Sequence, residues 1–253
     1  MHDTPLGIAT LLFVVAQHAS LAVLIGATLC AIWLRTADAP GTALVRGELA
    51  KVSMVGAVVL LVVSALRFAI DAAPSDAAES MESMGDAESL ATVAGWIGVM
   101  HRIAVSTWIG TVVIAAFKVM PHLRDTLPST ARTCASFVRA LSKSATYVLV
   151  FVVGTGIYNA TMHIDSLDHV IESAYGQVLM FKVLLVSVAA ALGAYNRFIE
   201  MPALMPALED ASTREPTPLL RRFARVLVTE SIVLMAVLIT AAILVSFVHH
   251  HMD

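Results

Sequence analysis

An imidazole and a guanidinium lie inside a long apolar stretch of this chain, GVMHRIAVSTWIG at residues 98–110. An ionisable side chain in a membrane helix costs about 2.5–3.5 kcal/mol on insertion scales, so each one is a candidate for function. Met100 precedes His101, and imidazole and thioether groups together suit copper, the thioether favouring Cu(I). The alternative for His101 is a packed histidine that hydrogen-bonds to a neighbouring helix. Arg102 points about 100° away on a helix and is expected to anchor the segment.

Further candidate metal ligands lie on the same side of the predicted membrane or deeper within it. Met162 precedes His163, His169 follows six residues later, and His18 lies within the first apolar segment. Taken singly, His163 and His169 could be ordinary loop residues. The HHHMD end of the chain adds three imidazoles and a thioether, as a native feature or as the remnant of a tag.

Polar side chains also recur at helical spacing within the apolar segments. Trp108 follows His101 by seven residues and shares its face of a helix. Tyr175, Lys182 and Asn196 are spaced by multiples of seven, which predicts a polar stripe facing protein or water. Lys182 would repel a cation, so it is assigned to structure or gating, with an ion pair to an outer acid as the alternative.

Glu230 is the one acid inside a predicted span. A structural ion pair with Arg197 or Arg225 is its expected role. Together with Trp108, Tyr175, Lys182, Asn196 and Arg102, it forms the set of polar residues that line a transport path or serve structure.

The elements that position these residues are membrane helices. The 253 residues are 58% hydrophobic and 14% charged, whereas soluble domains carry roughly 25% charged residues. Segments without strand-like alternation predict an all-α bundle rather than a barrel. We expect one integral membrane domain over 1–253, with six transmembrane helices near 6–34, 52–70, 95–120, 144–161, 175–198 and 226–248.

The charge distribution predicts the topology. Thirteen of the sixteen Lys and Arg residues lie in the connections 35–51, 118–143 and 197–225, whereas the other connections and the ends carry none and hold eleven acids. The positive-inside rule then puts the basic connections in the cytoplasm and both termini outside. Counting about 1.5 Å per residue, His101 and Lys182 lie roughly 10 Å below the outer surface and His18 roughly 18 Å below it.

Several function classes have no sequence support. Two cysteines give no disulfide framework and no cysteine-based metal site. Phosphate-binding loops, dinucleotide fingerprints, HExxH and nucleophile elbows are absent from the sequence, and nothing indicates nucleic acid. We therefore expect no enzyme activity unless the chain binds haem.

The polar residues of spans three to six resemble those of the copper resistance protein D family. The resemblance is carried by His101 with Trp108-Ile-Gly, by YGQVLMFKVLLVSVAAALGAYNRF at 175–198, and by Arg225 and Glu230 before the last span. It implies an inner-membrane protein that moves copper from periplasm to cytoplasm. Many members have about eight spans, and the family's Trp-x-Gly-Gly stands here as Trp-Ile-Gly-Thr.

Three functions remain open at this point. The first is copper binding and import, with the metal held by His101 together with Met100, His163 or His169. The second is an accessory membrane subunit that docks a periplasmic copper-binding protein. The third is a b-type haem redox protein with His18 and His101 as axial ligands, against which their different predicted depths count.

Overall fold

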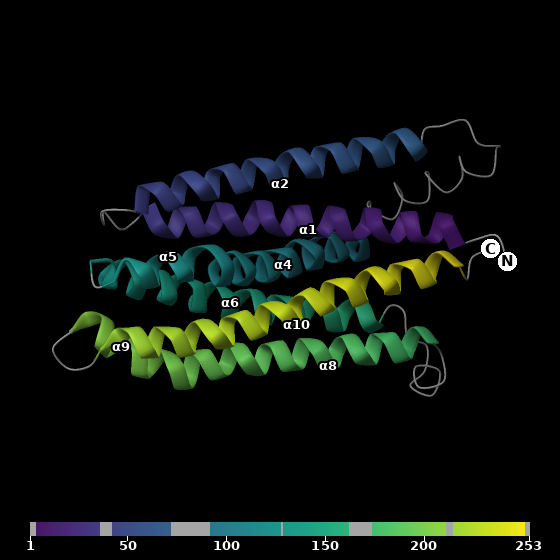
Figure 1. Cartoon of the computed structure of the whole chain (residues 1–253). Helices are drawn as coiled ribbons and strands as arrows, with labels where there is room; N and C mark the ends of the chain where they lie inside the picture. Colours follow the sequence, from purple (N-terminus) through teal and green to yellow (C-terminus); the bar gives the residue numbers. More distant parts are fainter. Residues whose placement is uncertain are drawn as a thin grey trace.

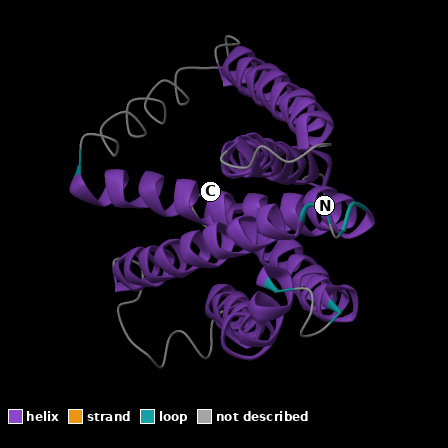
Figure 2. Ribbon diagram, turned by 90° about the vertical axis from the view of Figure 1, so that its left-hand side faces the viewer, coloured by secondary structure: helices purple, strands orange, loops and turns teal. Residues whose placement is uncertain are grey.

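The computed structural model describes six stretches of the chain: residues 4–35, 42–71, 92–127, 129–161, 174–210 and 215–250. Side chains are described at 11–35, 42–69, 92–127, 129–161, 176–210 and 215–243. The regular structure in these stretches is entirely helical, as the view along the bundle in Figure 2 shows. Six helical segments are long and apolar enough to cross a membrane. The predicted all-α, six-span architecture is therefore confirmed.

The helices form three long hairpins, two of them with a short extra helix at the bend (Figure 1). In chain order they are α1 (Thr4–Arg35), α2 (Thr42–Asp71), α4 (Val93–Ile114), η1 (Ala115–Val119), α5 (Met120–Asp125), α6 (Ala131–Thr161), α8 (Ala174–Tyr195), η2 (Asn196–Glu200), α9 (Met201–Glu209) and α10 (Pro216–His250). We call the end of the bundle where α1 finishes and α2 begins the basic end. The end where α4 and α8 begin is the acidic end.

The basic connections expected from the sequence are mostly helical. Beyond the predicted spans, α2 begins at Thr42 rather than 52, α6 at Ala131 rather than 144, and α10 at Pro216 rather than 226. Lys and Arg are good helix formers, so the helices continue where their charged side chains can reach water. The described parts of the segments 35–51, 118–143 and 197–225 thus extend the bundle at the basic end.

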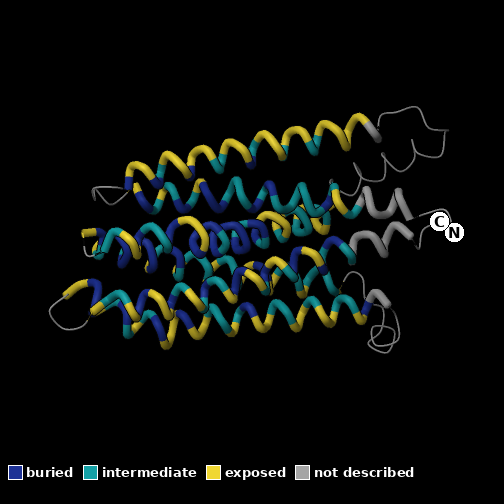
Figure 3. Tube along the Cα trace, in the orientation of Figure 1, coloured by how far each residue is buried: buried dark blue, intermediate teal, exposed yellow. Residues whose placement is uncertain are grey.

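The helices pack in a chain of neighbours. α1 packs against both α2 and α4, α4 packs against α6, and α10 packs against α8, while α10 also contacts α1 and α4. α2 lies at one side of the bundle, and much of its surface is exposed (Figure 3). Exposed aliphatic side chains on these outer surfaces are what lipid requires of a spanning helix.

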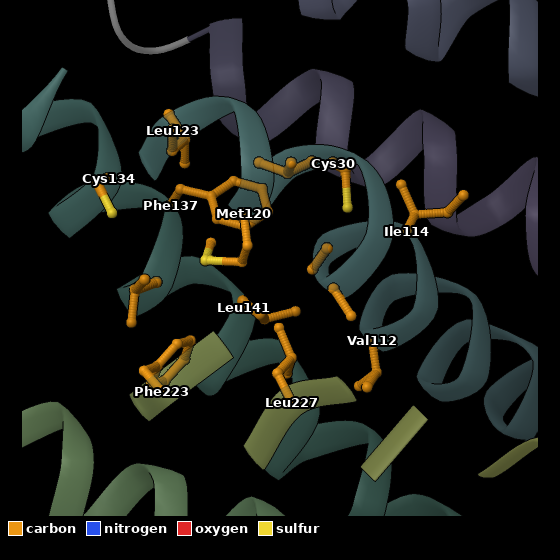
Figure 4. Packing of buried hydrophobic residues seen from close by; sticks show 14 of the residues in the cluster. Cys30, Val112, Ile114, Met120, Leu123, Cys134, Phe137, Leu141, Phe223 and Leu227 are labelled. Carbon is orange, nitrogen blue, oxygen red and sulfur yellow. The ribbon is translucent and has the colours of Figure 1, made fainter. Parts of the chain in front are cut away.

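The best-packed core lies toward the basic end. Met120 and Leu123 of α5 pack there with Phe137 and Leu141 of α6 and with Phe223 of α10 (Figure 4). This core fixes the halves of the two later hairpins that lie toward the basic end relative to α1. The polar residues of α4, α8 and α10 are thereby held on rigid helices rather than on loops.

Two glycines set the register between α1 and α4. A methyl group on Gly26 would lie 2.7 Å from the Cα of Gly110, and one on Gly110 would overlap the backbone of Ala22. Backbones approach this closely only where side chains are absent, which is how small residues pack membrane helices. The contact locks the two helices at one relative height.

The hairpins α4–α6 and α8–α10 share a repeated motif that sequence analysis did not identify. The pattern F-x-x-M-P-x-L occurs at 117–123 and again 81 residues later at 198–204. In each copy a π-turn, η1 or η2, is followed at once by a helix with proline in its first turn. Proline has no N–H for the usual i→i−4 bond, which accounts for the widened turn before it.

Candidate functional site

His101 is held between α4 and α6 by a directed hydrogen bond. Thr92 starts α4 by accepting a hydrogen bond from the Gly95 N–H at 3.1 Å. Two turns further, His101 Nδ1 lies 2.8 Å from Thr155 Oγ1 on α6. Thr155 gives its own hydrogen to the Phe151 carbonyl at 2.7 Å, so its oxygen accepts from Nδ1–H. In the neutral ring, Nε2 then keeps its lone pair for a ligand.

Gly156 makes room for the imidazole. A methyl group at Gly156 would lie 3.3 Å from His101 Cε1, so the ring packs on the bare backbone of α6. The hydrogen bond and the close fit are what a packed histidine shows, and they are equally the second-shell support that a metal-ligating histidine has. Met100, the neighbouring thioether, is 38% exposed.

His18 has the same tautomer by a different route. Its Nδ1 lies 2.8 Å from the Val14 carbonyl, one turn back on α1. A carbonyl oxygen only accepts, so Nδ1 carries the proton and Nε2 the lone pair in the neutral ring.

The glycine contact between α1 and α4 changes the predicted depth of His18. Gly26 lies level with Gly110, so eight residues earlier on each helix His18 lies level with Arg102. Ala22 also contacts Gly110, and four residues earlier on each helix this contact places His18 level with Ser106. His18 thus lies level with 102–106, about 1.5–7.5 Å deeper than His101 by helix rise.

The two imidazoles nevertheless lie on different sides of α4: His18 belongs to α1, whereas His101 projects from α4 toward α6. Gly110 faces α1, and His101 lies nine residues before it, which is half a turn round the helix. His101 accordingly contacts α6. This arrangement gives no support to a haem held between His18 and His101.

Two cations stand near both imidazoles. Arg102 on α4 and Lys182 on α8 act electrostatically on His18 and on His101. Arg102 is exposed and Lys182 is half-buried. The half of the bundle toward the acidic end therefore places two imidazoles near positive charge, a setting that would admit a cation only together with an anionic or polarisable partner.

Glu230 pairs with a tryptophan rather than with arginine. Its Oε1 accepts the indole N–H of Trp108 at 3.2 Å, with both residues buried. Gly193 on α8 leaves the space for the carboxyl group, since a methyl group there would lie 3.2 Å from Oε1. The expected ion pair with Arg197 or Arg225 is wrong. Arg197 instead donates to Ser142 Oγ at 2.8 Å, because it projects toward α6 and away from α10.

The inner part of α8 carries two more buried polar residues. Asn196 and Glu200 begin and end η2, with exposed fractions of 5% and 3%. Glu200 forms an ion pair with Arg222 of α10 at 3.2 Å. Neither amide atom of Asn196 has a hydrogen-bond partner among the described residues.

An open groove of about 380 Å³ lies beside this ion pair toward the basic end. It is lined by Leu192, Tyr195, Glu200, Arg222, Arg225, Val226 and Thr229. The buried Glu200 carboxylate thereby lies at an open groove between α8 and α10.

Some predicted ligands lie outside the described residues. These are Met162, His163 and His169, and the side chain of Tyr175 is likewise not described. Within the described residues, no three His, Cys, Asp or Glu side chains converge as a metal site. A site built on His101 would need ligands from the undescribed segments.

Sequence reasoning missed Thr155 and Glu200. The repeated motif would have pointed to Glu200, because it aligns Asn196 and Glu200 with Ala115 and Val119 of the first copy. Polar residues at apolar positions of a repeat mark a change of role. Thr155 had no signal, since its contact with His101 joins residues 54 apart in the chain.

Comparison with known proteins finds similarity in the second half of the chain. Residues 135–244 match the family Copper resistance protein D. Over this region the chain is similar to the copper resistance protein D family. The chain is 29% identical over 114 residues to Copper resistance protein D of Pseudomonas syringae pv. tomato. That match covers 44% of this chain and 36% of the relative, so the chain spans about a third of that relative's length. No solved structure matches this chain.

The matched region holds the buried polar residues of α8 and α10 together with His163 and His169, but not the histidines of α1 and α4. It takes in α8, η2, α9 and most of α6 and α10, with Thr155, Asn196, Glu200 and Glu230. His18, His101 and Trp108 precede it. The family match begins at residue 135, after the third span, whereas the sequence resemblance begins within the third span.

Proposed function

We propose that this protein binds copper near its acidic end and passes it across the bacterial inner membrane into the cell. The acidic end would face the periplasm, with both termini on that side, because the basic connections belong in the cytoplasm. The similarity of residues 135–244 to the copper resistance protein D family supports copper as the cargo. A periplasmic copper-binding protein would deliver it.

The observation that carries this proposal is the 2.8 Å hydrogen bond between His101 Nδ1 and Thr155 Oγ1. Thr155 accepts from Nδ1–H, so Nε2 is the nitrogen available to a metal. A neutral imidazole suits copper, and the thioethers of Met100 and Met162 favour Cu(I). His163 and His169 would complete the site from the segment that follows α6. His18, one helix away and deeper, would receive the ion next.

Arg102 and Lys182 do not fit as ligands. Each carries a positive charge at its usual protonation and would repel copper. Lys182 is therefore assigned to gating, where it would leave the region when copper enters with a thiolate or chloride ligand. Arg102, which is exposed, is assigned to anchoring in the outer headgroup layer.

The direct test is copper uptake into proteoliposomes that contain the purified protein. His101→Ala should abolish uptake, whereas His122→Ala, on α5 at the opposite end, should leave it unchanged. Copper content per purified protein should fall in the first variant alone. Uptake by wild type no greater than by empty liposomes would overturn transport and leave the accessory-subunit role.

A visible spectrum of the same preparation separates copper from haem, the alternative cofactor. Copper handling predicts no Soret band. A Soret band that His101→Ala abolishes would assign the Nε2 lone pair to haem iron instead and overturn the copper site.

A further inference from the structure

Three buried polar residues form a row along the seam between α8 and α10. Glu230, Asn196 and Glu200 are 3%, 5% and 3% exposed. Gly193 touches the Glu230 carboxyl group, and Asn196 and Glu200 follow Gly193 by three and seven residues. The helix rise puts Glu200 about 10 Å further toward the basic end than Glu230, with Asn196 between them.

Asn196 has no structural partner that would explain its burial. Both its amide nitrogen and its amide oxygen lack hydrogen bonds within the described residues. Leaving a buried polar group unsatisfied is destabilising, so proteins rarely retain one for packing alone. In the first copy of the repeat, Ala115 fills the same position. An amide both donates and accepts, which is what holding a water between two carboxyl groups requires.

Glu230 has a hydrogen-bond donor but no counter-ion. Among the described side chains its partner is the Trp108 indole, and no ion pair involves it. Burial without a counter-ion favours the neutral, proton-bearing carboxyl group. The titratable and charged groups on the surrounding elements include His18 on α1, His101 and Arg102 on α4, Lys182 and Tyr195 on α8, Arg197 and Glu200 on η2, and Arg221, Arg222 and Arg225 on α10 itself.

Glu200 connects this row to water. Its carboxylate pairs with Arg222, whose side chain is 54% exposed, and it lines the open groove with Arg225 and Thr229. The row thus has a proton-bearing end at the middle of the bundle and a solvated end at the basic side.

We propose that Glu230, Asn196 and Glu200 form a proton path between the centre of the bundle and water at the basic end. The Glu230 O–H bond breaks and its proton passes to a water that Asn196 holds. That water releases a proton to the Glu200 carboxylate, which gives it up to water in the groove. No electrons move, and reprotonation of Glu230 runs the same steps in reverse. Hard oxygen groups suit protons better than they suit Cu(I), which separates this path from the copper site.

Infrared spectroscopy of the full chain in lipid nanodiscs tests the path without copper. A protonated carboxyl group shows a carbonyl stretch that shifts when its hydrogen is replaced by deuterium. Wild type should show such a band, and Glu230→Gln should lose it. Glu48→Gln, which alters an exposed carboxylate paired with Lys51, should keep it.

The rate of the shift after transfer to D₂O reports the route. Asn196→Leu should slow it, whereas Thr240→Val, which removes another buried polar group of α10, should not. Should Asn196→Leu fail to fold, Glu200→Gln keeps the side-chain shape and should slow the shift as well. An unchanged band in Glu230→Gln would overturn the proposal. So would wild-type exchange rates in Asn196→Leu, or in Glu200→Gln where that variant replaces it.

Discussion

Trp108 on α4 donates its indole N–H to the Glu230 carboxyl group on α10, 3.2 Å away across a buried seam. The bond joins the first and last helices of the two repeated hairpins. It also gives a buried acid its single described partner, so its loss should be felt in stability.

We expect Trp108→Phe to lower the free energy of unfolding by about 2–4 kcal/mol. The substitution leaves the Glu230 carboxyl group without its donor and removes part of a buried ring. Thermal unfolding in detergent measures the change. Trp96→Phe serves as the control, since Trp96 is 59% exposed and its loss should shift the midpoint little. Equal shifts in both variants would contradict a structural role for the indole bond.

Thr155→Val should weaken copper binding about 10- to 100-fold, the usual cost of losing the second-shell partner of a metal-ligating histidine. Valine has nearly the shape of threonine but cannot accept from His101 Nδ1–H. Competition with a coloured copper chelator measures the affinity. Thr146→Val on the same helix is the matched control, because the hydrogen bond of Thr146 within the described part of the chain goes to the Ser142 carbonyl, one turn back on α6. Wild-type copper affinity in Thr155→Val would contradict the assignment of His101 as a copper ligand supported by Thr155.

Gly26→Val should prevent the close approach of α1 to α4. The added side chain overlaps the backbone of Gly110. A backbone cannot rotate away as a side chain can, so the overlap is relieved only if the two helices separate. We expect loss of monodisperse protein in size-exclusion chromatography. Gly47→Ala on α2 meets no atom within 4 Å and should be neutral or stabilise by up to about 1 kcal/mol. A well-folded Gly26→Val would show that the two helices tolerate separation.

Arg222→Gln should destabilise the protein by about 1–3 kcal/mol, because it leaves the buried Glu200 carboxylate without its cation. The half-exposed guanidinium lets water compensate part of the loss. Lys51→Gln breaks an exposed pair with Glu48 and should cost about 0–1 kcal/mol. Chemical denaturation measures the free energy of unfolding of both variants. A larger loss in Lys51→Gln than in Arg222→Gln would contradict the greater contribution assigned to the Glu200–Arg222 pair.

Apolar length and charge placement determined much of the fold by themselves. Each span must satisfy its own backbone in lipid, so six apolar segments of sufficient length dictate six helices. The ionisable residues inside them, among them His101, Lys182 and Glu230, were visible for the same reason, since lipid penalises them one by one. The continuation of α2, α6 and α10 past the membrane was not visible, because charged residues end a hydrophobic run without ending a helix.

Only the tertiary structure decided how these residues pair. Glu230 meets Trp108 rather than an arginine, and Thr155 meets His101, because such contacts depend on helix register and rotation. The Gly26–Gly110 contact fixes that register, and it brings His18 to within 1.5–7.5 Å of the height of His101. Spacing along one helix states which residues share a face, but it does not state what faces them. That is set by close packing between helices, whose contacts join residues far apart in the chain.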